Sequence, residues 1–383
     1  LCRQRKGVHA QHHFRHLVRP QIAQRARFRH LARNRAQNGA AFVEFRIVGG
    51  NVVGALEAGA MFELHIREFR RDLQRLIHVP VRGREDQLAA LLRQIADDRD
   101  RRGVFGDVFD VQRLNLVAQL GINRLSIGVQ SFQAAKLKAL GRIHDGDEAI
   151  RAADMARAAG FDNFNLDLMH GLPDQSIEDA LSDLRIAIAQ QPTHLSWYQL
   201  TMEPNTLFWS QPPTLPEDDT LWDIQEAGQQ LLAEHGYLQY EVSAYARAGH
   251  QARHNLNYWS FGDFIGIGAG AHGKLSSPSG QIVRTWKTRL PKDYLDPDKA
   301  FLAGERALTS EELPFEFLMN VLRLNDGCSS ALFTQRTGLP LSVLSTARAE
   351  AEARGLLLRD PQRLAASREG QLFLNDLLQY FLT

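Results

Sequence analysis

Strand-like and helix-like segments alternate in the run from Arg124 to Pro173, and this alternation constrains the fold more than any other feature. Residues 125–131 and 164–169 are short, apolar and rich in branched side chains, as expected for buried parallel strands. Between them, residues 134–140 and 148–159 favour helices, each followed by a glycine that can end it. A strand, a helix and a further strand predict a right-handed crossover in a parallel sheet. The run is typical of a piece of an α/β barrel.

The same alternation continues further along the chain. Ser176 and Asp179 resemble a capping box ahead of an apolar stripe with helical spacing. Residues 194–200 supply a third strand, residues 219–235 favour a helix, and residues 238–245 read as one more strand. We therefore expect a mostly parallel sheet with helices packed on it.

The last eighty or so residues change character. Their pattern predicts a helix, a second helix, two strands and a last helix over residues 315–324, 341–354, 356–359, 363–367 and 370–382. This order is typical of a winged-helix-like domain, which would suit DNA binding. Acidic residues dilute the basic charge that a DNA-binding surface needs: Glu350, Glu352, Asp360, Glu369 and Asp376.

These patterns divide the chain into residues 1–113, 114–300 and 301–383. Residues 1–110 contain 21 Lys and Arg against 12 Asp and Glu, whereas the remainder contains 24 against 32. The basic segment is either an arm for nucleic acid or acidic lipid, or a solvated, poorly ordered stretch. Aromatic side chains for base stacking are sparse in it, which favours the second interpretation.

Two further properties limit the class of protein. No apolar run reaches the roughly 18 residues that a membrane span needs, and the polar beginning lacks the apolar core of a secretory signal, so we expect a cytoplasmic protein. Cys2 and Cys328 are the two cysteines of the chain. A disulfide framework, or a site with three thiolates from this chain alone, is excluded.

Polar residues fall where strands are expected to end. Gln130, Asp167 and Thr201 lie at predicted carboxyl ends of strands, where ligands of parallel sheets bind. Asp167 could hold a ribose hydroxyl or an ammonium group, and the Arg142 guanidinium suits a carboxylate. The alternatives are that Asp167 caps a turn before Gly171 and that Arg142 is a surface charge. The pattern alone favours neither.

Six ordered motifs, from Gly128 onward, resemble one family. They are GVQSF, LGRIHDGDEA, FDNFNLDLMHGLP, LSWYQLTMEPNT, HNLNYW and GIGAGAHG. Together they resemble the radical S-adenosylmethionine proteins related to oxygen-independent coproporphyrinogen III oxidase, from about Leu114 to the end of the chain. HNLNYW narrows the resemblance to the HemW-type haem chaperones, which lack the oxidase activity.

The resemblance implies a partial (β/α)6 barrel that binds a 4Fe-4S cluster and S-adenosylmethionine. By family position, Gln130, Arg142 and Asp167 would line the S-adenosylmethionine pocket, with Thr201 and His272 as further contacts. His254, in HNLNYW, would contact haem, since imidazole is a natural axial ligand of haem iron. The alternative for His254 is a core histidine that donates to a backbone carbonyl.

The CxxxCxxC loop that holds the cluster in this family is absent from the chain. We therefore predict that no cluster assembles and that S-adenosylmethionine is not cleaved. The N-terminal half of the barrel is not recognisable, and our hypothesis is that residues 1–113 arise from a reading-frame or gene-start artefact. Three classes of function stay open: an inactive HemW-like protein, possible homodimers included; a non-catalytic module that passes haem or a porphyrin to an acceptor protein; and a nucleic-acid-binding protein.

Overall fold

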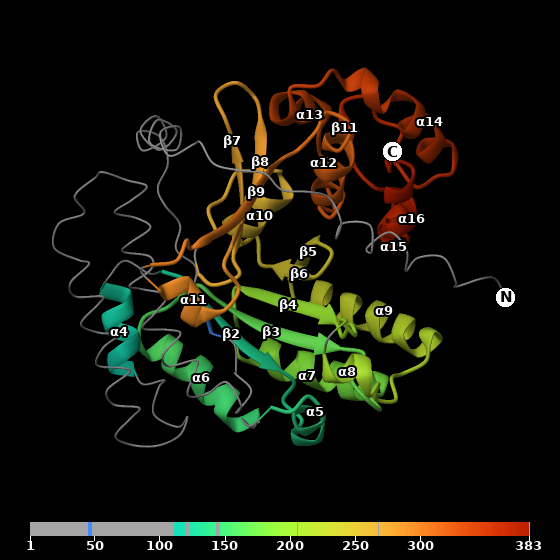
Figure 1. Cartoon of the computed structure of the whole chain (residues 1–383). Coiled ribbons are helices and arrows are strands. Elements are labelled where there is room, and N and C mark those ends of the chain that lie inside the picture. The colour runs from blue at the N-terminus through green and yellow to red at the C-terminus, as the bar shows by residue number, and fades with distance from the viewer. Residues whose placement is uncertain are drawn as a thin grey trace.

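The computed structural model contains a six-stranded sheet, a three-stranded antiparallel sheet and a helical C-terminal unit (Figure 1). It describes the backbone of residues 45–47 and the following ranges: 111–119, 123–142, 146–204, 206–266, 268–296 and 298–382. The basic segment predicted up to residue 44 lies outside these ranges. Within them, no helix is long and apolar enough to cross a membrane.

The six-stranded sheet has the order β1-β2-β3-β4-β6-β5. Its strands are β1 (Phe45–Ile47), β2 (Leu125–Gln130), β3 (Phe164–His170), β4 (His194–Gln199), β5 (Leu238–Glu241) and β6 (Ala244–Ala246). The strands β1 to β4 are parallel, which confirms the predicted parallel sheet. The single strand predicted over residues 238–245 is wrong, because the chain turns at Val242 and Ser243 and forms an antiparallel hairpin there.

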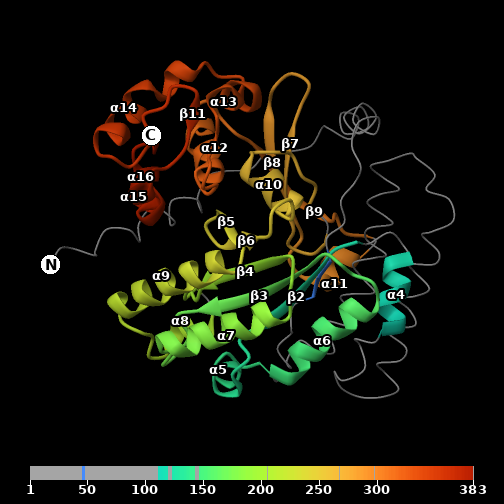
Figure 2. The same cartoon turned by 180° about the vertical axis from the view of Figure 1, so that it is seen from behind.

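Helices cover one face of this sheet (Figure 2). They are α4 (Val111–Gln119), α5 (Ala134–Ala139), α6 (Gly146–Ala158), α7 (Ile177–Ala189) and α9 (Asp218–Glu234). The predicted capping box begins α7, since the Asp179 backbone N–H donates to Ser176 Oγ at 3.1 Å and the Ser176 N–H donates back to Asp179 Oδ2 at 3.0 Å. The core between helices and sheet includes Ile127, Val129, Leu166, Leu168, Leu195, Ala153, Ala156, Leu184, Ile224 and Leu232.

The opposite face of the sheet is polar. Residues that alternate with the apolar core positions carry hydroxyl, amide, imidazole and carboxyl groups on β2, β3 and β4, and they are buried or half-buried: Ser126, Asn165, Asp167, His194 and Ser196. The expectation of strands that are apolar throughout is therefore correct for one face only. A barrel sheet has an inner face, and in this chain that face is lined with hydrogen-bonding groups.

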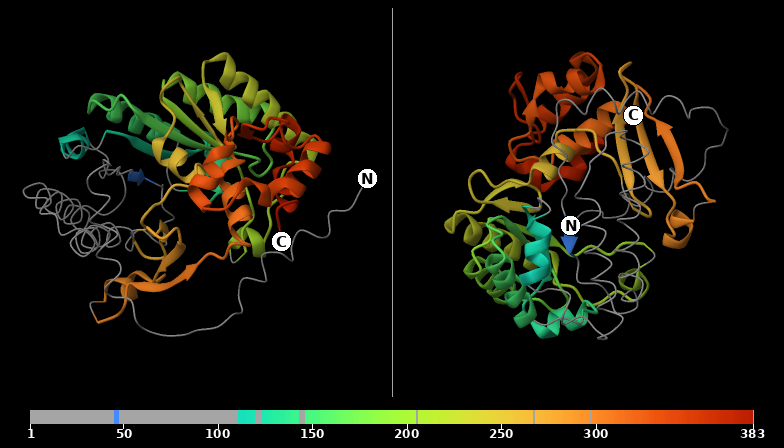
Figure 3. Two further views of the ribbon diagram at one scale, coloured as in Figure 1. Left: turned by 90° about the horizontal axis from the view of Figure 1, so that it is seen from above. Right: turned by 90° about the vertical axis from the view of Figure 1, so that its left-hand side faces the viewer.

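A second sheet, which the sequence did not predict, lies on the polar side of the first. It is antiparallel and consists of β7 (His272–Ser276), β8 (Ile282–Lys287) and β9 (Leu302–Ala307). The helices α10 (Arg253–Trp259) and α11 (Pro291–Leu295) accompany it, and a short helix, α8 (Leu207–Ser210), follows β4. Figure 3 shows this sheet and the C-terminal unit side by side, away from α6 and α7.

The C-terminal unit packs its helices around a core of its own. Its elements are α12 (Leu313–Val321), β10 (Cys328–Ser329), α13 (Ser330–Thr337), a 3-10 turn (Leu341–Leu344), α14 (Ser345–Ala353), β11 (Arg363–Leu364), α15 (Arg368–Leu372) and α16 (Leu374–Gln379). The predicted winged-helix-like order lacked α13. The predicted strand pair is reduced to β11, which pairs with β10, and to one bridge between Leu357 and Ala366.

The hairpin of β5 and β6 joins the barrel to the C-terminal unit. The Val242 N–H donates to the Arg323 carbonyl at 3.1 Å, and the Asn325 N–H donates to the Tyr240 carbonyl at 3.1 Å. The Arg323 guanidinium also lies 3.3 Å from the buried Glu241 carboxylate. Strand β5 is therefore held by β6 on one side and by residues of the C-terminal unit on the other.

Candidate functional site

Gln130 ends β2 in an unusual backbone conformation. Its φ is +67°, and the pairing of β2 with β3 shifts register between Gly128 and Gln130. The side chain is buried, and Tyr198 on β4 donates its hydroxyl hydrogen to Gln130 Oε1 at 2.9 Å. A positive φ is rare for residues other than glycine and persists where the surroundings hold it, often at a functional site.

Arg142 follows α5 at the same end of β2. Its backbone N–H donates to the Leu137 carbonyl at 2.9 Å, and Gly141 before it has a φ of +67°, as expected for the residue that ends a helix. The Arg142 side chain is half-buried rather than a fully exposed surface charge.

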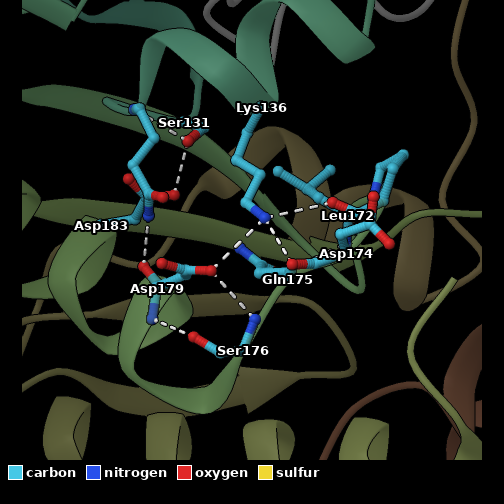
Figure 4. A network of polar contacts seen from close by, with 10 residues as sticks. Ser131, Lys136, Leu172, Asp174, Gln175, Ser176, Asp179 and Asp183 are labelled. Atoms are coloured by element: carbon cyan, nitrogen blue, oxygen red, sulfur yellow. Dashed lines mark hydrogen bonds and ion pairs between the residues drawn. The ribbon is translucent and has the colours of Figure 1, made fainter.

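A polar cluster around Lys136 fixes α5 to the chain that follows β3 (Figure 4). The buried Lys136 ammonium donates to the carbonyls of Asp174 at 2.6 Å and Pro173 at 3.2 Å. It also lies 3.3 Å from Asp179 Oδ2, at the first turn of α7. One cation thus ties the segments after β2 and β3 to each other, and Gln130 and Arg142 flank α5.

Asp183 makes a second connection between the same elements. Its carboxylate accepts from Ser131 Oγ at 2.7 Å and from the Phe132 backbone N–H at 2.9 Å. Burial raises the pKa of Asp183, and the hydrogen bonds from Ser131 and Phe132 oppose that shift. The residue directly after Gln130 is therefore held against α7.

Asp167 lies in the middle of β3 and not at its carboxyl end, which corrects the sequence prediction. The strand continues to His170 because Leu168, Met169 and His170 still pair with β4. The Asp167 carboxylate does not cap a turn either: it accepts from Ser126 Oγ at 3.0 Å and from Asn165 Nδ2 at 2.9 Å. It faces the polar side of the sheet, as Asn165 does.

The two remaining predicted contacts lie apart from the polar face. Thr201 is exposed, two residues beyond the end of β4, and donates to Glu203 Oε1 at 3.2 Å. His272 is exposed at the start of β7, in the other sheet, where it pairs with Trp286. Gln130 and Asp167 lie in strands of the six-stranded sheet, whereas Thr201 and His272 lie outside that sheet and are exposed.

His254 lies on α10, within HNLNYW. Its side chain is exposed, and the centroid of its ring lies 4.5 Å from that of Tyr258, one helical turn later, in an edge-to-face arrangement. The alternative of a core histidine is therefore wrong. An exposed imidazole on a short helix is accessible to a large planar ligand.

Sequence reasoning missed three buried residues beside Asp167. His194 Nδ1 lies 2.6 Å from Asn165 Oδ1, and His194 Nε2 lies 2.9 Å from the Tyr240 hydroxyl. Burial lowers the pKa of His194 well below its usual value, helped by the positive charge of Arg124, and burial raises the pKa of Tyr240 to about 12. The signal that could have found Asn165 and His194 is the polar residue at every second position of their strands.

The residues present do not fit an iron–sulfur cluster. Cys328 lies in the C-terminal ribbon, where burial raises the pKa of its thiol to about 12, and Cys2 lies outside the described ranges. Three thiolate ligands are not available from a chain with two cysteines. Among the described residues, no group of three or more His, Cys, Asp or Glu side chains could hold a metal ion.

The polar face presents groups that suit a nucleoside. They include a carboxylate at Asp167 and an amide at Gln130, and these are the types that bind ribose hydroxyls and base edges. An ionised carboxylate has about four acceptor positions, so two hydrogen bonds leave Asp167 able to accept from a ligand.

Comparisons with known proteins identify the family and the fold of the chain. The sequence model of the Radical SAM superfamily matches residues 70–185, which starts before the predicted boundary near residue 113, and that of the HemN C-terminal domain matches residues 308–373. The solved structure of coproporphyrinogen III oxidase (HemN) from Escherichia coli, a radical SAM enzyme, shares the fold with a TM-score of 0.65 at 18% identity, over 86% of this chain and 84% of that one.

Two curated relatives are much closer in sequence. "Heme chaperone HemW" of Escherichia coli (strain K12) is 55% identical over 262 residues, which is 68% of this chain and 69% of that protein. "Heme chaperone HemW" of Haemophilus influenzae is 48% identical over 274 residues, 72% of this chain and 71% of that protein. Family, fold and motifs agree, and the chain belongs to the HemW family of haem chaperones within the radical S-adenosylmethionine superfamily.

Proposed function

We propose that this chain binds and delivers haem and does so without an iron–sulfur cluster. The observation that carries the proposal is the exposed imidazole of His254 on α10, in a chain whose relatives are named haem chaperones. A neutral imidazole ligates haem iron, and the Tyr258 ring beside it offers an apolar edge to a porphyrin.

The polar face of the barrel is the proposed site for S-adenosylmethionine. Asp167 accepts from ribose hydroxyls, Gln130 contributes an amide from the end of β2, and Arg142 pairs with the methionine carboxylate. Thr201 and His272 belong to the same proposal as contacts at the margin of the site. The cluster and S-adenosylmethionine together supply one-electron chemistry in this superfamily. With no fit for the cluster, the proposed role here is binding and not cleavage.

A haem-accepting protein completes the proposal. A chaperone must release its cargo, so the acceptor has to approach the exposed face of α10 that carries His254. A cytoplasmic location, which the sequence predicts, and a homodimer, which it leaves open, are compatible with this role and belong to the proposal as well.

The test is a haem titration followed by the Soret absorption band. The wild-type chain should bind haemin with a shifted Soret maximum, and His254→Ala should weaken binding by roughly tenfold or more, as expected for a lost axial ligand. His250→Ala is the matched control, because His250 is exposed and only four residues away. Equal loss in both variants, or none in His254→Ala, would contradict the assignment of His254.

A further inference from the structure

A continuous line of side-chain hydrogen bonds runs from Asp167 to α10. Asn165 Nδ2 donates to Asp167 Oδ1 at 2.9 Å, and Asn165 Oδ1 lies 2.6 Å from His194 Nδ1. His194 Nε2 lies 2.9 Å from the Tyr240 hydroxyl, whose oxygen accepts from Asn255 Nδ2 at 3.2 Å. We call these five residues, from Asp167 to Asn255, the relay.

The Asp167 carboxylate sets the direction of the bonds in the relay together with Ser126, whose Oγ accepts from Asn165 Nδ2 at 2.7 Å. An ionised carboxylate only accepts, so Asn165 must point its amide nitrogen at Asp167 and its oxygen at His194. His194 then has to donate from Nδ1, and its neutral ring accepts at Nε2 from the Tyr240 hydroxyl. A second donor agrees with this orientation, since Ser196 Oγ donates to Asn165 Oδ1 at 3.2 Å.

The far end of the relay holds the helix that carries His254. With its hydrogen directed at His194, the Tyr240 oxygen presents its lone pairs to α10, where it accepts from the Asn255 amide and from the Ala252 backbone N–H at 3.3 Å. Ala252 is the residue that precedes the helix. Asn255 and His254 are neighbours in HNLNYW, so the start of that motif is fixed on a buried phenol.

We infer that Asp167 is a positioning residue for His254: through Asn165, His194 and Tyr240, its carboxylate orients the start of α10 for haem. This inference rests on the proposed haem site. It also assigns the second residue of HNLNYW a role of its own, namely attachment of the helix to Tyr240. Because linkage is reciprocal, a ligand that donates to Asp167 should change haem affinity and haem should change the affinity for that ligand.

The direction of the relay can be measured without haem. In the wild-type chain, 15N shifts of the His194 ring, assigned with His194→Gln, should show a neutral ring protonated at Nδ1. Asp167→Asn is nearly isosteric but can either accept from or donate to Asn165, so it should no longer fix the proton of His194 at Nδ1 and should give a mixture of both ring forms. A wild-type ring protonated at Nε2 would overturn the inference even if haem binds as proposed.

A double-mutant cycle on haem affinity then tests the connection. Asp167→Asn and Tyr240→Phe should each weaken haem binding by roughly five- to tenfold, the size expected for one hydrogen bond. The double variant should be no weaker than Tyr240→Phe alone, because both changes break the same relay. Effects that multiply would overturn the inference.

Tyr245→Phe is the matched control. Tyr245 is equally buried on the adjacent strand β6 but faces Trp197 in the apolar core, outside the relay. Its variant should bind haem like the wild type, and its effect should multiply with that of Asp167→Asn. Loss of haem binding in Tyr245→Phe equal to that in Tyr240→Phe would mean a general effect of lost tyrosine hydroxyls and would overturn the inference. A wild-type chain that binds no haem would instead contradict the proposed function, and His254 would need no positioning.

Discussion

Tyr198 and Gln130 meet at the carboxyl ends of β4 and β2, where the phenol donates to the amide oxygen at 2.9 Å. The bond spans the strand between them, and it holds a glutamine whose φ of +67° normally favours glycine. The sheet therefore holds Gln130 in a backbone conformation that glutamine rarely adopts.

Gln130→Gly should weaken the binding of S-adenosylmethionine while changing the free energy of unfolding only a little. The variant loses one hydrogen bond of about 1 kcal/mol and leaves a small cavity, but it relieves a positive φ that costs about 1 to 3 kcal/mol, so the free energy of unfolding should change by less than about 2 kcal/mol. Binding of S-adenosylmethionine, measured calorimetrically, should weaken by about tenfold. The control is Gln191→Gly, with a φ of +51° at an exposed position, which should leave binding unchanged. Unchanged binding in Gln130→Gly would remove Gln130 from the proposed site.

Lys136→Met should destabilise the barrel by about 2 kcal/mol, because two backbone carbonyls and the Asp179 carboxylate lose their shared donor in a buried place. Unfolding in urea gives the value. Lys138→Met, on the exposed side of the same helix, should stay within about 0.5 kcal/mol of the wild type. Similar losses in the two variants would mean that the cluster in Figure 4 does not hold α5.

The free energy of unfolding should decrease as the pH is lowered below about 6.5, and protonation of His170 should account for part of this decrease. Burial lowers the pKa of His170 to about 4, so the unfolded chain binds a proton that the folded chain does not between these two values. The resulting loss is about 2 kcal/mol between pH 7.5 and pH 5 for this residue. His170→Phe should remove that share of the slope in urea unfolding at the two pH values. A slope identical to the wild type would contradict it.

Gly228→Ala should destabilise the chain although alanine normally favours a helix. An added Cβ would lie 2.0 Å from Trp197 Cη2, on the core face of α9. Overpacking of this kind costs about 1 to 3 kcal/mol, more than the roughly 1 kcal/mol gained in helix propensity. Trp197→Phe makes room, so the double variant should be more stable than the sum of the two single changes predicts. Additive losses would show that the helix moves away instead.

The periodic elements of the barrel could be predicted from the sequence. Buried strands and helix ends around Gly141 and Gly160 follow from local patterns, and both glycines have the expected positive φ. The hairpin at Val242 could not, because its turn carries no glycine, proline or asparagine and depends on Arg323, some eighty residues later. Helix α13 was missed although Ser329 and Gly338 mark its two ends.

In the candidate site, too, some residues could be predicted from local sequence and others depend on contacts between distant segments. Residue type and position predicted Gln130 and Asp167 as site residues, but the position of Asp167 within β3 depends on pairing with β4. Tyr240 was missed altogether, since it joins the site through contacts with His194 and Asn255 that no local spacing announces. Family resemblance identified His254, and only the fold shows that its side chain is exposed.

One absorption spectrum tests whether the chain handles haem without a cluster. The wild-type chain is treated anaerobically with iron and sulfide, desalted and then mixed with haemin. We predict no broad sulfide-to-iron absorption in the visible region after desalting, and a shifted Soret band once haemin is added. Stable cluster absorption with stoichiometric acid-labile sulfide, or the Soret band of free haemin, would contradict the account.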